Sequence, residues 1–200
     1  MLYGYVAHAQ TSQPKYLNFG TAFGFLNPLG INDAIYVDYG IGSRFMLEAE
    51  KGISKKGALQ TGLQFSMSTF AMDAIINTGN KLVTAPDSLK YTSINQSSLQ
   101  IPLRYRYYKN ENKDGKFYQF GATVGYTINN TYRYRLNGED KEQNITDVNP
   151  IQLAVHMGLG ARTKNKHVFY MDWSLNVTRY FKQHDASNFY PLQLCIGVLL

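Results

Sequence analysis

The sequence is poor in cysteine, in charge and in long apolar runs, and each shortage excludes a class of protein. Its 200 residues include a single cysteine, Cys195, so neither an internal disulfide nor a cysteine-rich zinc module can form. No run approaches the roughly 18 apolar residues that a membrane-spanning helix needs, and mean hydropathy is −0.31. Charged residues make up only 17% and aromatic residues 14%, which is not the profile of a disordered chain. The length suits one domain.

Short motifs of common enzyme and cofactor sites are also missing. The sequence has no H-E-x-x-H, G-x-S-x-G, P-loop, C-x-x-C or EF-hand pattern. We therefore predict no catalytic, cofactor-binding or metal-binding site. Lys and Arg outnumber Asp and Glu by 20 to 14, but they are dispersed along the chain and form no basic stripe. This dispersion argues against nucleic acid as a partner.

The sequence does contain eight segments in which apolar and polar side chains alternate, and this period of two is typical of β-strands. In the segment from Ile35 to Ile53, for example, Val37, Phe45 and Leu47 oppose polar or small neighbours. The eight segments cover residues 16–25, 35–53, 59–67, 99–107, 118–129, 151–160, 169–178 and 192–198.

The connections between these segments alternate in length. The links at 26–34, 71–90, 137–150 and 182–188 are longer or more polar, whereas those at 54–56, 109–116 and 163–166 are short. Short periplasmic turns that alternate with longer extracellular loops are typical of bacterial outer-membrane barrels. The pattern predicts an all-β fold: an eight-stranded antiparallel up-and-down transmembrane β-barrel, with both termini on the periplasmic side.

The composition of the polar face indicates which side of the barrel meets the membrane. This face carries mainly Gly, Gln, Asn, Ser and Thr, which suit a narrow lumen, whereas a soluble barrel would carry Lys and Glu there. The apolar face then contacts lipid. Aromatic residues near the strand ends suggest the girdles found at both membrane interfaces. The alternative is a soluble lipocalin-like carrier whose apolar face encloses a ligand.

The first residues resemble the end of a secretory signal. Leu2 to Ala9 is mostly apolar, and Ala7-His8-Ala9 fits the small-x-small rule for cleavage before Gln10. We therefore interpret residues 1–9 as a residual signal-peptide segment and residues 10–200 as the barrel domain. The alternative is an ordinary first strand. Export through the periplasm leads to the outer membrane of a Gram-negative cell.

Two stretches resemble a known family. Leu99-Gln100-Ile101-Pro102-Leu103-Arg104-Tyr105-Arg106-Tyr107 is similar to the L-x-I-P-L...Y strand of the PorT-like outer-membrane β-barrel family, and the stretch 54–63 is similar to its K-x-x-L-Q-x-G-L turn and strand. The resemblance implies an integral outer-membrane barrel, and one branch of the family is linked to type IX secretion. Many members have no assigned activity. Gln100 stands where the family often has an acidic residue.

Charged residues on the inward face form the most informative set of side chains. The second and fourth predicted strands run in the same direction, so the charged residues at 48, 50, 104 and 106 should lie at similar depth in the barrel. Asp172 and Arg162 should lie nearby, so opposite charges can compensate one another. We predict an interior ionic cluster made of Glu48, Glu50, Arg104, Arg106 and Asp172. It fits a polar plug, and the alternative is a conduction path or proton-linked gate. We also expect a structural, inward-facing His156.

Other basic residues lie near the predicted outer rim. Arg179 should point outward, where it can contact lipopolysaccharide phosphates, whereas Arg133 and Arg135 should point into the mouth of the barrel. We therefore expect outer-membrane lipid, lipopolysaccharide and other envelope proteins as partners. The expected role is structural or accessory, including membership of a secretion or assembly complex. The alternative is a lipid A-modifying enzyme that uses His184, Asp185 and Ser187 in the last outer loop.

Overall fold

The computed structural model describes residues 15–30, 37–72, 75–77, 82–84, 89–146, 148–180, 182 and 189–200. The predicted signal segment at 1–9 and half of the connection at 71–90 lie outside these residues. Within the described part of the chain, no helix has the length and hydropathy needed to cross a membrane.

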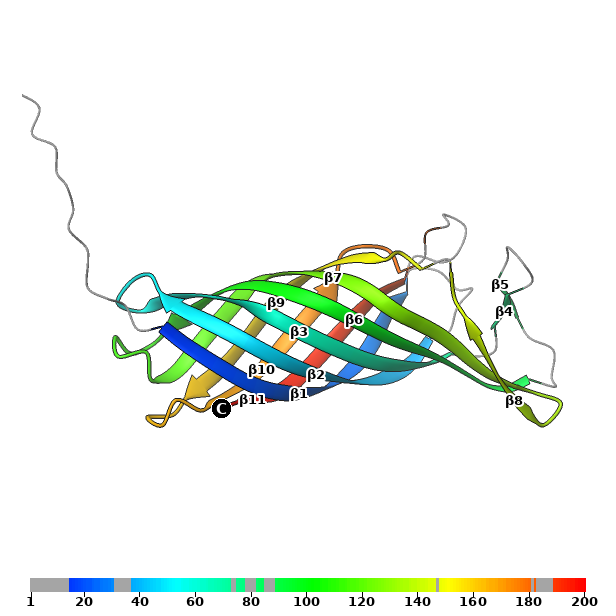
Figure 1. The fold of residues 1–200 in the computed structure, drawn as a ribbon, viewed down its shortest axis with the longest axis horizontal. Coiled ribbons are helices and arrows are strands. Elements are labelled where there is room, and N and C mark those ends of the chain that lie inside the picture. Colours follow the sequence, from blue (N-terminus) through cyan, green and yellow to red (C-terminus); the bar gives the residue numbers. More distant parts are fainter. Residues whose placement is uncertain are drawn as a thin grey trace, which may run out of the picture.

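Eight strands close into a single antiparallel barrel (Figure 1). Each strand pairs with its neighbour in the order β6-β3-β2-β1-β11-β10-β9-β7, and pairing between β7 and β6 closes the ring. The predicted eight-stranded all-β barrel is therefore confirmed. The barrel strands are β1 (Lys15–Gly30), β2 (Val37–Gly52), β3 (Gly57–Met72), β6 (Leu89–Tyr108), β7 (Gly115–Leu136), β9 (Ile151–Arg162), β10 (Val168–Asn176) and β11 (Phe189–Leu199).

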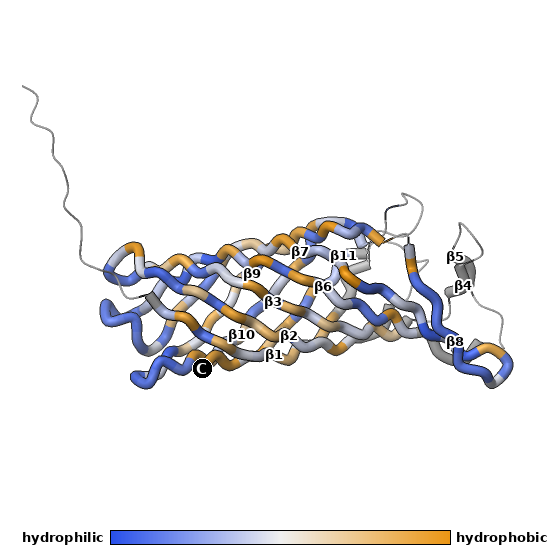
Figure 2. The backbone as a smooth tube through the Cα atoms, viewed as in Figure 1, coloured by the Kyte–Doolittle hydropathy of each residue, from blue (hydrophilic) through white to orange (hydrophobic). Residues whose placement is uncertain are grey.

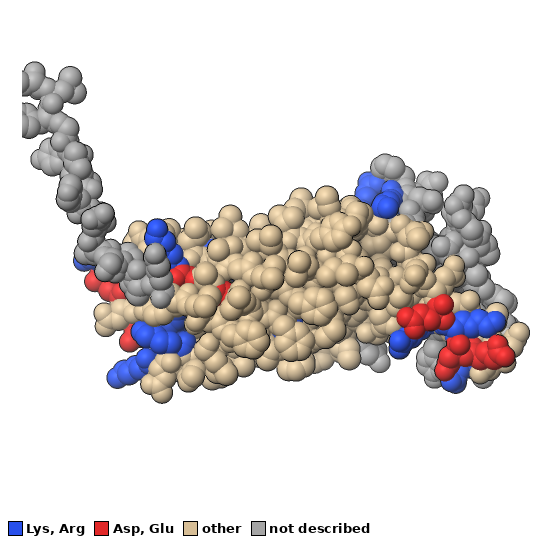
Figure 3. All heavy atoms as spheres, viewed as in Figure 1, with Lys and Arg blue, Asp and Glu red and all other residues tan. Residues whose placement is uncertain are grey.

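Apolar and polar residues alternate along the strands of this barrel (Figure 2). The apolar side chains lie on the outside of the wall. Leu17 and Phe23 are 71% and 69% exposed, whereas Gln60 and Gln64 on the inner face are fully buried. In the view of Figure 3, charged residues gather at the two ends and leave the middle of the wall uncharged. A soluble carrier needs the reverse arrangement, so that alternative is excluded.

The two ends of the barrel differ. Tight turns join β2 to β3, β6 to β7, and β9 to β10 at one end, which we call the short-turn end. Leu200 lies at this end, where it exchanges backbone hydrogen bonds with Phe19. We call the opposite end, which carries the longer connections, the long-loop end.

The segment 137–150, which the sequence predicted to be a connection between strands, contains a strand of its own. β7 continues to Leu136, and β8 (Glu139–Asn144) pairs with it in antiparallel register. Asn137 and Gly138 form the turn with positive φ angles of 53° and 88°. Asn-Gly is a strong signal for such a two-residue hairpin, because both central positions need positive φ. Every residue of β8 is exposed. A second hairpin, β4 (Ile75–Asn77) with β5 (Leu82–Thr84), pairs separately.

A bulge in β7 corrects the predicted direction of two arginines. Ser97 pairs with Asn129 and Ser98 with Thr127, so Ile128 is an extra residue on β7. One extra residue exchanges the two faces of a strand. Arg133 therefore lies on the exposed face beside Glu142 instead of in the barrel mouth.

Arg135 follows the same shifted phase. Its side chain is about half exposed and pairs with Asp140 on β8 at 2.7 Å. In exchange, Tyr132 turns inward and packs against buried apolar residues. The prediction that Arg133 and Arg135 point into the mouth is thus wrong, because alternation does not reveal where a strand gains a residue.

Candidate functional site

The interior ionic cluster lies in the half of the lumen nearest the short-turn end. β2 carries Glu48 and Glu50, β6 carries Arg104 and Arg106, and β10 carries Asp172. All five side chains are buried. The structure brings all five together, in contacts that connect strands separated by at least one neighbour.

Glu50 is the most heavily bonded member of the cluster. Arg106 Nη1 lies 2.6 Å from one of its carboxylate oxygens, and Arg162 donates to both oxygens at 2.7 and 2.8 Å. The Tyr108 hydroxyl donates to the same carboxylate at 2.9 Å. Arg106 also lies over the Phe117 ring, with its guanidinium carbon 4.3 Å from the ring centroid. This layer closes the lumen next to the short turns.

Glu48 and Arg104 form the next layer, one step further from the short turns. Arg104 Nη1 lies 3.3 Å from Glu48 Oε1, and its other nitrogen Nη2 lies 3.9 Å from Asp172. Gln60, on the intervening strand β3, donates to Glu48 and accepts from Arg106 at 3.2 Å. Amide side chains thus fill the gaps between the ion pairs.

Asp172 gathers donors from three other strands. His156 Nδ1 lies 2.8 Å from Asp172 Oδ2, and Arg44 Nη1 lies 3.3 Å from the same oxygen. The Gln119 amide donates to Asp172 Oδ1 at 3.1 Å. Arg44 also donates to the Ser174 hydroxyl at 2.9 Å. His156 is inward-facing and held by a carboxylate, so it serves as a hydrogen-bonded structural histidine.

Sequence reasoning did not assign Arg44, Tyr108 and the interior glutamines to the cluster. Arg44 shares the inward phase of Glu48, four positions away on β2, and that phase is the signal that identifies it. With Arg162, which was expected nearby, the described residues place four buried guanidinium groups and three buried carboxylates in the lumen.

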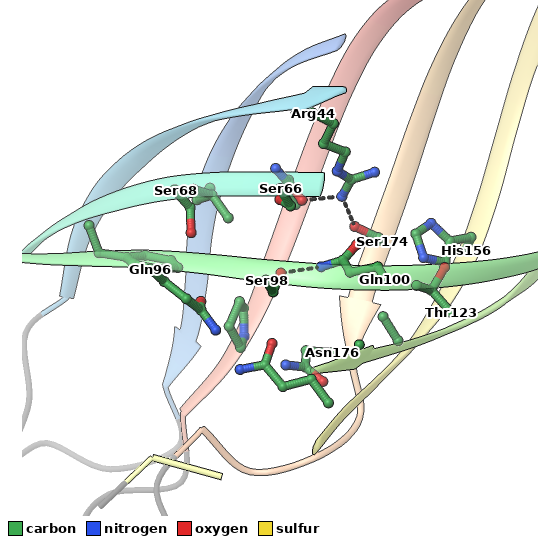
Figure 4. Close-up of a pocket in the computed structure, with 17 residues that line it drawn as sticks. Arg44, Ser66, Ser68, Gln96, Ser98, Gln100, Thr123, His156, Ser174 and Asn176 are labelled. Carbon is green, nitrogen blue, oxygen red and sulfur yellow. Dashed lines mark hydrogen bonds between the residues drawn. The ribbon is translucent and has the colours of Figure 1, made fainter. Parts of the chain in front are cut away.

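A small polar cavity lies beyond the ionic cluster, toward the long-loop end (Figure 4). Its volume is about 60 Å³. Gln100 crosses it, accepting from Gln64 at 2.6 Å and donating to Ser98 at 2.8 Å. A space of this size holds a few water molecules and no substrate.

An apolar cluster covers this cavity at the long-loop end. Phe70 and Tyr180 meet edge to face with ring centroids 6.1 Å apart, and Leu26, Ile94 and Val148 pack around them. The Tyr180 hydroxyl donates to Asn130 at 3.1 Å. Leu26, Phe70 and Ile94 lie on the inward phase of their strands, where the sequence led us to expect polar side chains. The lumen is therefore filled from both ends.

The remaining predicted residues lie apart from the cluster. Arg179 follows the end of β10 and is half-buried, next to the buried Tyr180. His184, Asp185 and Ser187 lie outside the described residues. Among the described residues, no group of three His, Cys, Asp or Glu side chains converges in a way that could hold a metal ion.

Comparison with protein families identifies the family of this chain. Residues 8–182 match the family described as outer membrane protein beta-barrel domain. The chain belongs to this family. A barrel of this family is an integral protein of the outer membrane, in agreement with the apolar outer wall. In such barrels the short turns face the periplasm and the long loops face the exterior.

Solved outer-membrane barrels share the fold. Neisserial surface protein A is 15% identical, with a TM-score of 0.52 over 94% of this chain and 99% of that one. Ail, the attachment invasion locus protein of Yersinia pestis, is 9% identical, with a TM-score of 0.48 over 94% of this chain and 97% of that one. A search among curated proteins gave no match. The likeness to Neisserial surface protein A concerns the fold alone.

Proposed function

We propose that this outer-membrane barrel has a structural or accessory role, in which a closed, non-enzymatic body presents surfaces to lipid and to other envelope proteins. The observation that carries the proposal is the filled lumen. Cross-lumen ion pairs, such as Arg162 with Glu50, occupy the periplasmic half, and the Phe70–Tyr180 cluster occupies the outer half. An eight-stranded barrel has room for side chains and little else.

The closed lumen makes the conduction alternative testable in planar lipid bilayers. We expect the purified protein to show no stepwise current at any voltage that the bilayer tolerates. A 16-stranded porin, which has an open channel, is the positive control for the same bilayers. Reproducible unitary steps that depend on this protein would overturn the proposal of a closed body.

A non-enzymatic role also predicts unchanged lipid A. Mass spectra of lipid A from cells that overproduce the protein should match those from cells without it, with the same acyl chains and phosphates. Loss of an acyl chain or phosphate, abolished by His184→Ala, would favour the lipid A-modifying alternative instead.

We further propose membership of the PorT-like branch, supported by the stretch from Leu99 to Tyr107. This part of β6 carries Arg104 and Arg106 inward and Leu103 outward, so the motif encodes both the ionic cluster and the lipid-facing wall. In a host with type IX secretion, deletion of the gene should lower the export of type IX substrates. Export at the normal level would exclude a secretion role.

Partners outside the cell would meet the long-loop end. β8 presents six exposed residues beyond the barrel wall. We propose that Arg179, which is half-buried after the end of β10, contacts lipopolysaccharide phosphates. A photo-crosslinking amino acid at Glu139 should capture an envelope protein in living cells, whereas the same group at Val124, on the membrane-facing wall, should capture lipid only. Arg179→Gln should lower the amount of lipopolysaccharide that stays bound in mild detergent.

A further inference from the structure

The short-turn end of the barrel carries a strong excess of positive charge. Its turns and adjoining strand ends hold nine lysines and two acidic residues in the described chain, apart from Glu50, whose carboxylate is paired inside the lumen. Blue side chains are visible at this end in Figure 3. The lysines are Lys15, Lys51, Lys55, Lys56, Lys109, Lys113, Lys116, Lys164 and Lys166, and the acidic residues are Glu111 and Asp114.

Three of these lysines end rows of side chains that face the membrane. Lys51 follows Leu47 and Ala49 on the outer face of β2, and it is exposed. On β6 and β7, Lys109 and Lys116 stand one outward position beyond Tyr107 and Tyr118, which are 43% and 64% exposed. Tyrosine rings of this kind settle at the level of lipid head groups. The ammonium groups of Lys51, Lys109 and Lys116 should therefore lie at the depth of the lipid head groups or slightly closer to the short turns.

Lys109 and Lys116 also stand directly opposite each other. They continue the register of β6 and β7 beyond Tyr108 and Phe117, and the Lys109 amide donates to the Lys116 carbonyl at 2.9 Å. Like charges in directly opposed positions on neighbouring strands destabilise the pairing. A bound anion between them removes that repulsion.

The acidic residues of the same turn do not supply this anion. Glu111 lies 3.7 Å from Lys55, and Asp114 accepts a hydrogen bond from Asn110 at 3.0 Å. No ion pair within the described part of the chain joins either acid to Lys109 or Lys116. The charges of Lys109 and Lys116 are therefore available to an anion outside the described chain.

We propose that the row-ending lysines Lys51, Lys109 and Lys116 bind the phosphate groups of anionic phospholipids in the periplasmic leaflet of the outer membrane. Lysine suits this position because its apolar stem lies along the barrel wall while its ammonium reaches the head group. A soluble acidic partner would instead engage lysines at the turn tips, such as Lys55 and Lys164. The outward phase of the three strand ends favours the lipid.

Lipid retention measures this binding directly. The protein, folded in neutral detergent with equal amounts of phosphatidylglycerol and phosphatidylcholine, is purified, and the lipids that remain bound are counted by native mass spectrometry. Wild-type protein should retain phosphatidylglycerol in preference. Each lysine beside an anionic head group strengthens attraction by about fivefold at low salt, so Lys109→Gln with Lys116→Gln should remove most of the preference.

A matched control removes the same charge at the other end. Lys141→Gln with Lys182→Gln changes two exposed lysines at the long-loop end and should leave the preference intact. Lys109→Arg with Lys116→Arg should keep it, because the charge remains. A heat-shifted band on unboiled gels shows that each variant is folded. Equal retention of the two lipids by the folded wild type, or equal loss in the control, would overturn the proposal.

Discussion

Arg162 and Glu50 face each other across the lumen and form a bidentate ion pair, with N–O distances of 2.7 and 2.8 Å. They belong to β9 and β2, which are not neighbours in the barrel, and they stand 112 residues apart in the sequence. Pairing between neighbouring strands fixes the wall, whereas this contact fixes one wall against the opposite one. It connects the ends of β2 and β9, which are distant in the sequence, across the lumen.

Arg162→Ala should therefore destabilise the barrel more than Arg162→Lys. Among the described residues, alanine leaves Glu50 with Arg106 as its one guanidinium partner, and removal of one member of a buried pair costs about 3–5 kcal/mol. Lysine keeps the charge but loses the planar fork that fits both oxygens. Urea-induced unfolding in lipid vesicles, followed by Trp173 fluorescence, ranks the variants. Equal stability of Arg162→Ala and Arg162→Lys would show that the bidentate geometry contributes nothing to stability.

A double-mutant cycle tests the pairing of Arg104 with Glu48. Arg104→Ala should lower the unfolding temperature, and the addition of Glu48→Ala should recover part of the loss, because the second change removes the carboxylate left unpaired. Recovery is partial, since Arg104 also contacts Asp172 at 3.9 Å. The temperature at which the compact gel band disappears gives all four values. Strictly additive effects would argue against a direct interaction.

The fold follows from the sequence because alternation carries most of the information. Each strand has one face in lipid and one in the lumen, so apolar and polar residues must alternate, and the phase identifies which charges enter the lumen. Glu48, Glu50, Arg104 and Arg106 share that phase on strands running in the same direction. The structure brings them together for this reason.

The remaining features depend on local departures from alternation. The extra residue Ile128 exchanges the faces of β7, and nothing in the residue types marks it as a bulge. Phe70 and Tyr180 are apolar residues in inward positions, and their contact depends on how β3 and the chain after β10 converge. The Asn137-Gly138 turn, by contrast, carries a recognisable sequence signal that the polar composition of its surroundings obscured.

Glycine at position 158 makes room for the Asp172 contacts. A Cβ atom there would lie 2.5 Å from the Met171 carbonyl oxygen and 3.1 Å from both Asp172 Oδ1 and Gln119 Nε2. Gly158→Ala should therefore cost about 1–3 kcal/mol of unfolding free energy, because the carbonyl belongs to the neighbouring strand and cannot move freely.

Gly125→Ala is the matched control for this change. Its Cβ would meet only the flexible Gln100 side chain, at 3.1 Å, so the effect should be smaller. Urea titrations of both variants in the same vesicles make the comparison. If Gly158→Ala and Gly125→Ala destabilised the barrel equally, the close approach of the Met171 carbonyl would not explain why position 158 carries glycine.

The β7–β8 hairpin should respond to acid. Hydrogen bonds from Arg133, with a smaller contribution from Thr131, lower the pKa of Glu142 from its ordinary 4.5, and hydrogen bonds from Arg135 lower the pKa of Asp140 from 3.8. Because both folded pKa values are depressed, these pairs support the hairpin above the ordinary pKa. That support is lost as the pH falls through the lowered values.

A carbon-detected NMR titration of the carboxyl groups in detergent micelles tests this expectation. Arg133→Gln should raise the midpoint of Glu142 toward 4.5 and leave that of Asp140 unchanged, whereas Arg135→Gln should do the reverse. A shift of both midpoints by either variant would show that the two pairs act as one unit.

Depth along the outer wall gives the sharpest test of the membrane assignment. Ile101 is 57% exposed midway along β6, whereas Ile53 is 55% exposed at the short-turn end, so water contact alone does not distinguish them. In a bilayer, arginine costs about 2–4 kcal/mol at the midplane and about 0–1 kcal/mol near the interface. Ile101→Arg should therefore lower the free energy of unfolding in vesicles far more than Ile53→Arg. In detergent micelles, which adapt to the side chain, the difference should shrink. Equal costs in vesicles would mean that the middle of the wall does not face hydrocarbon.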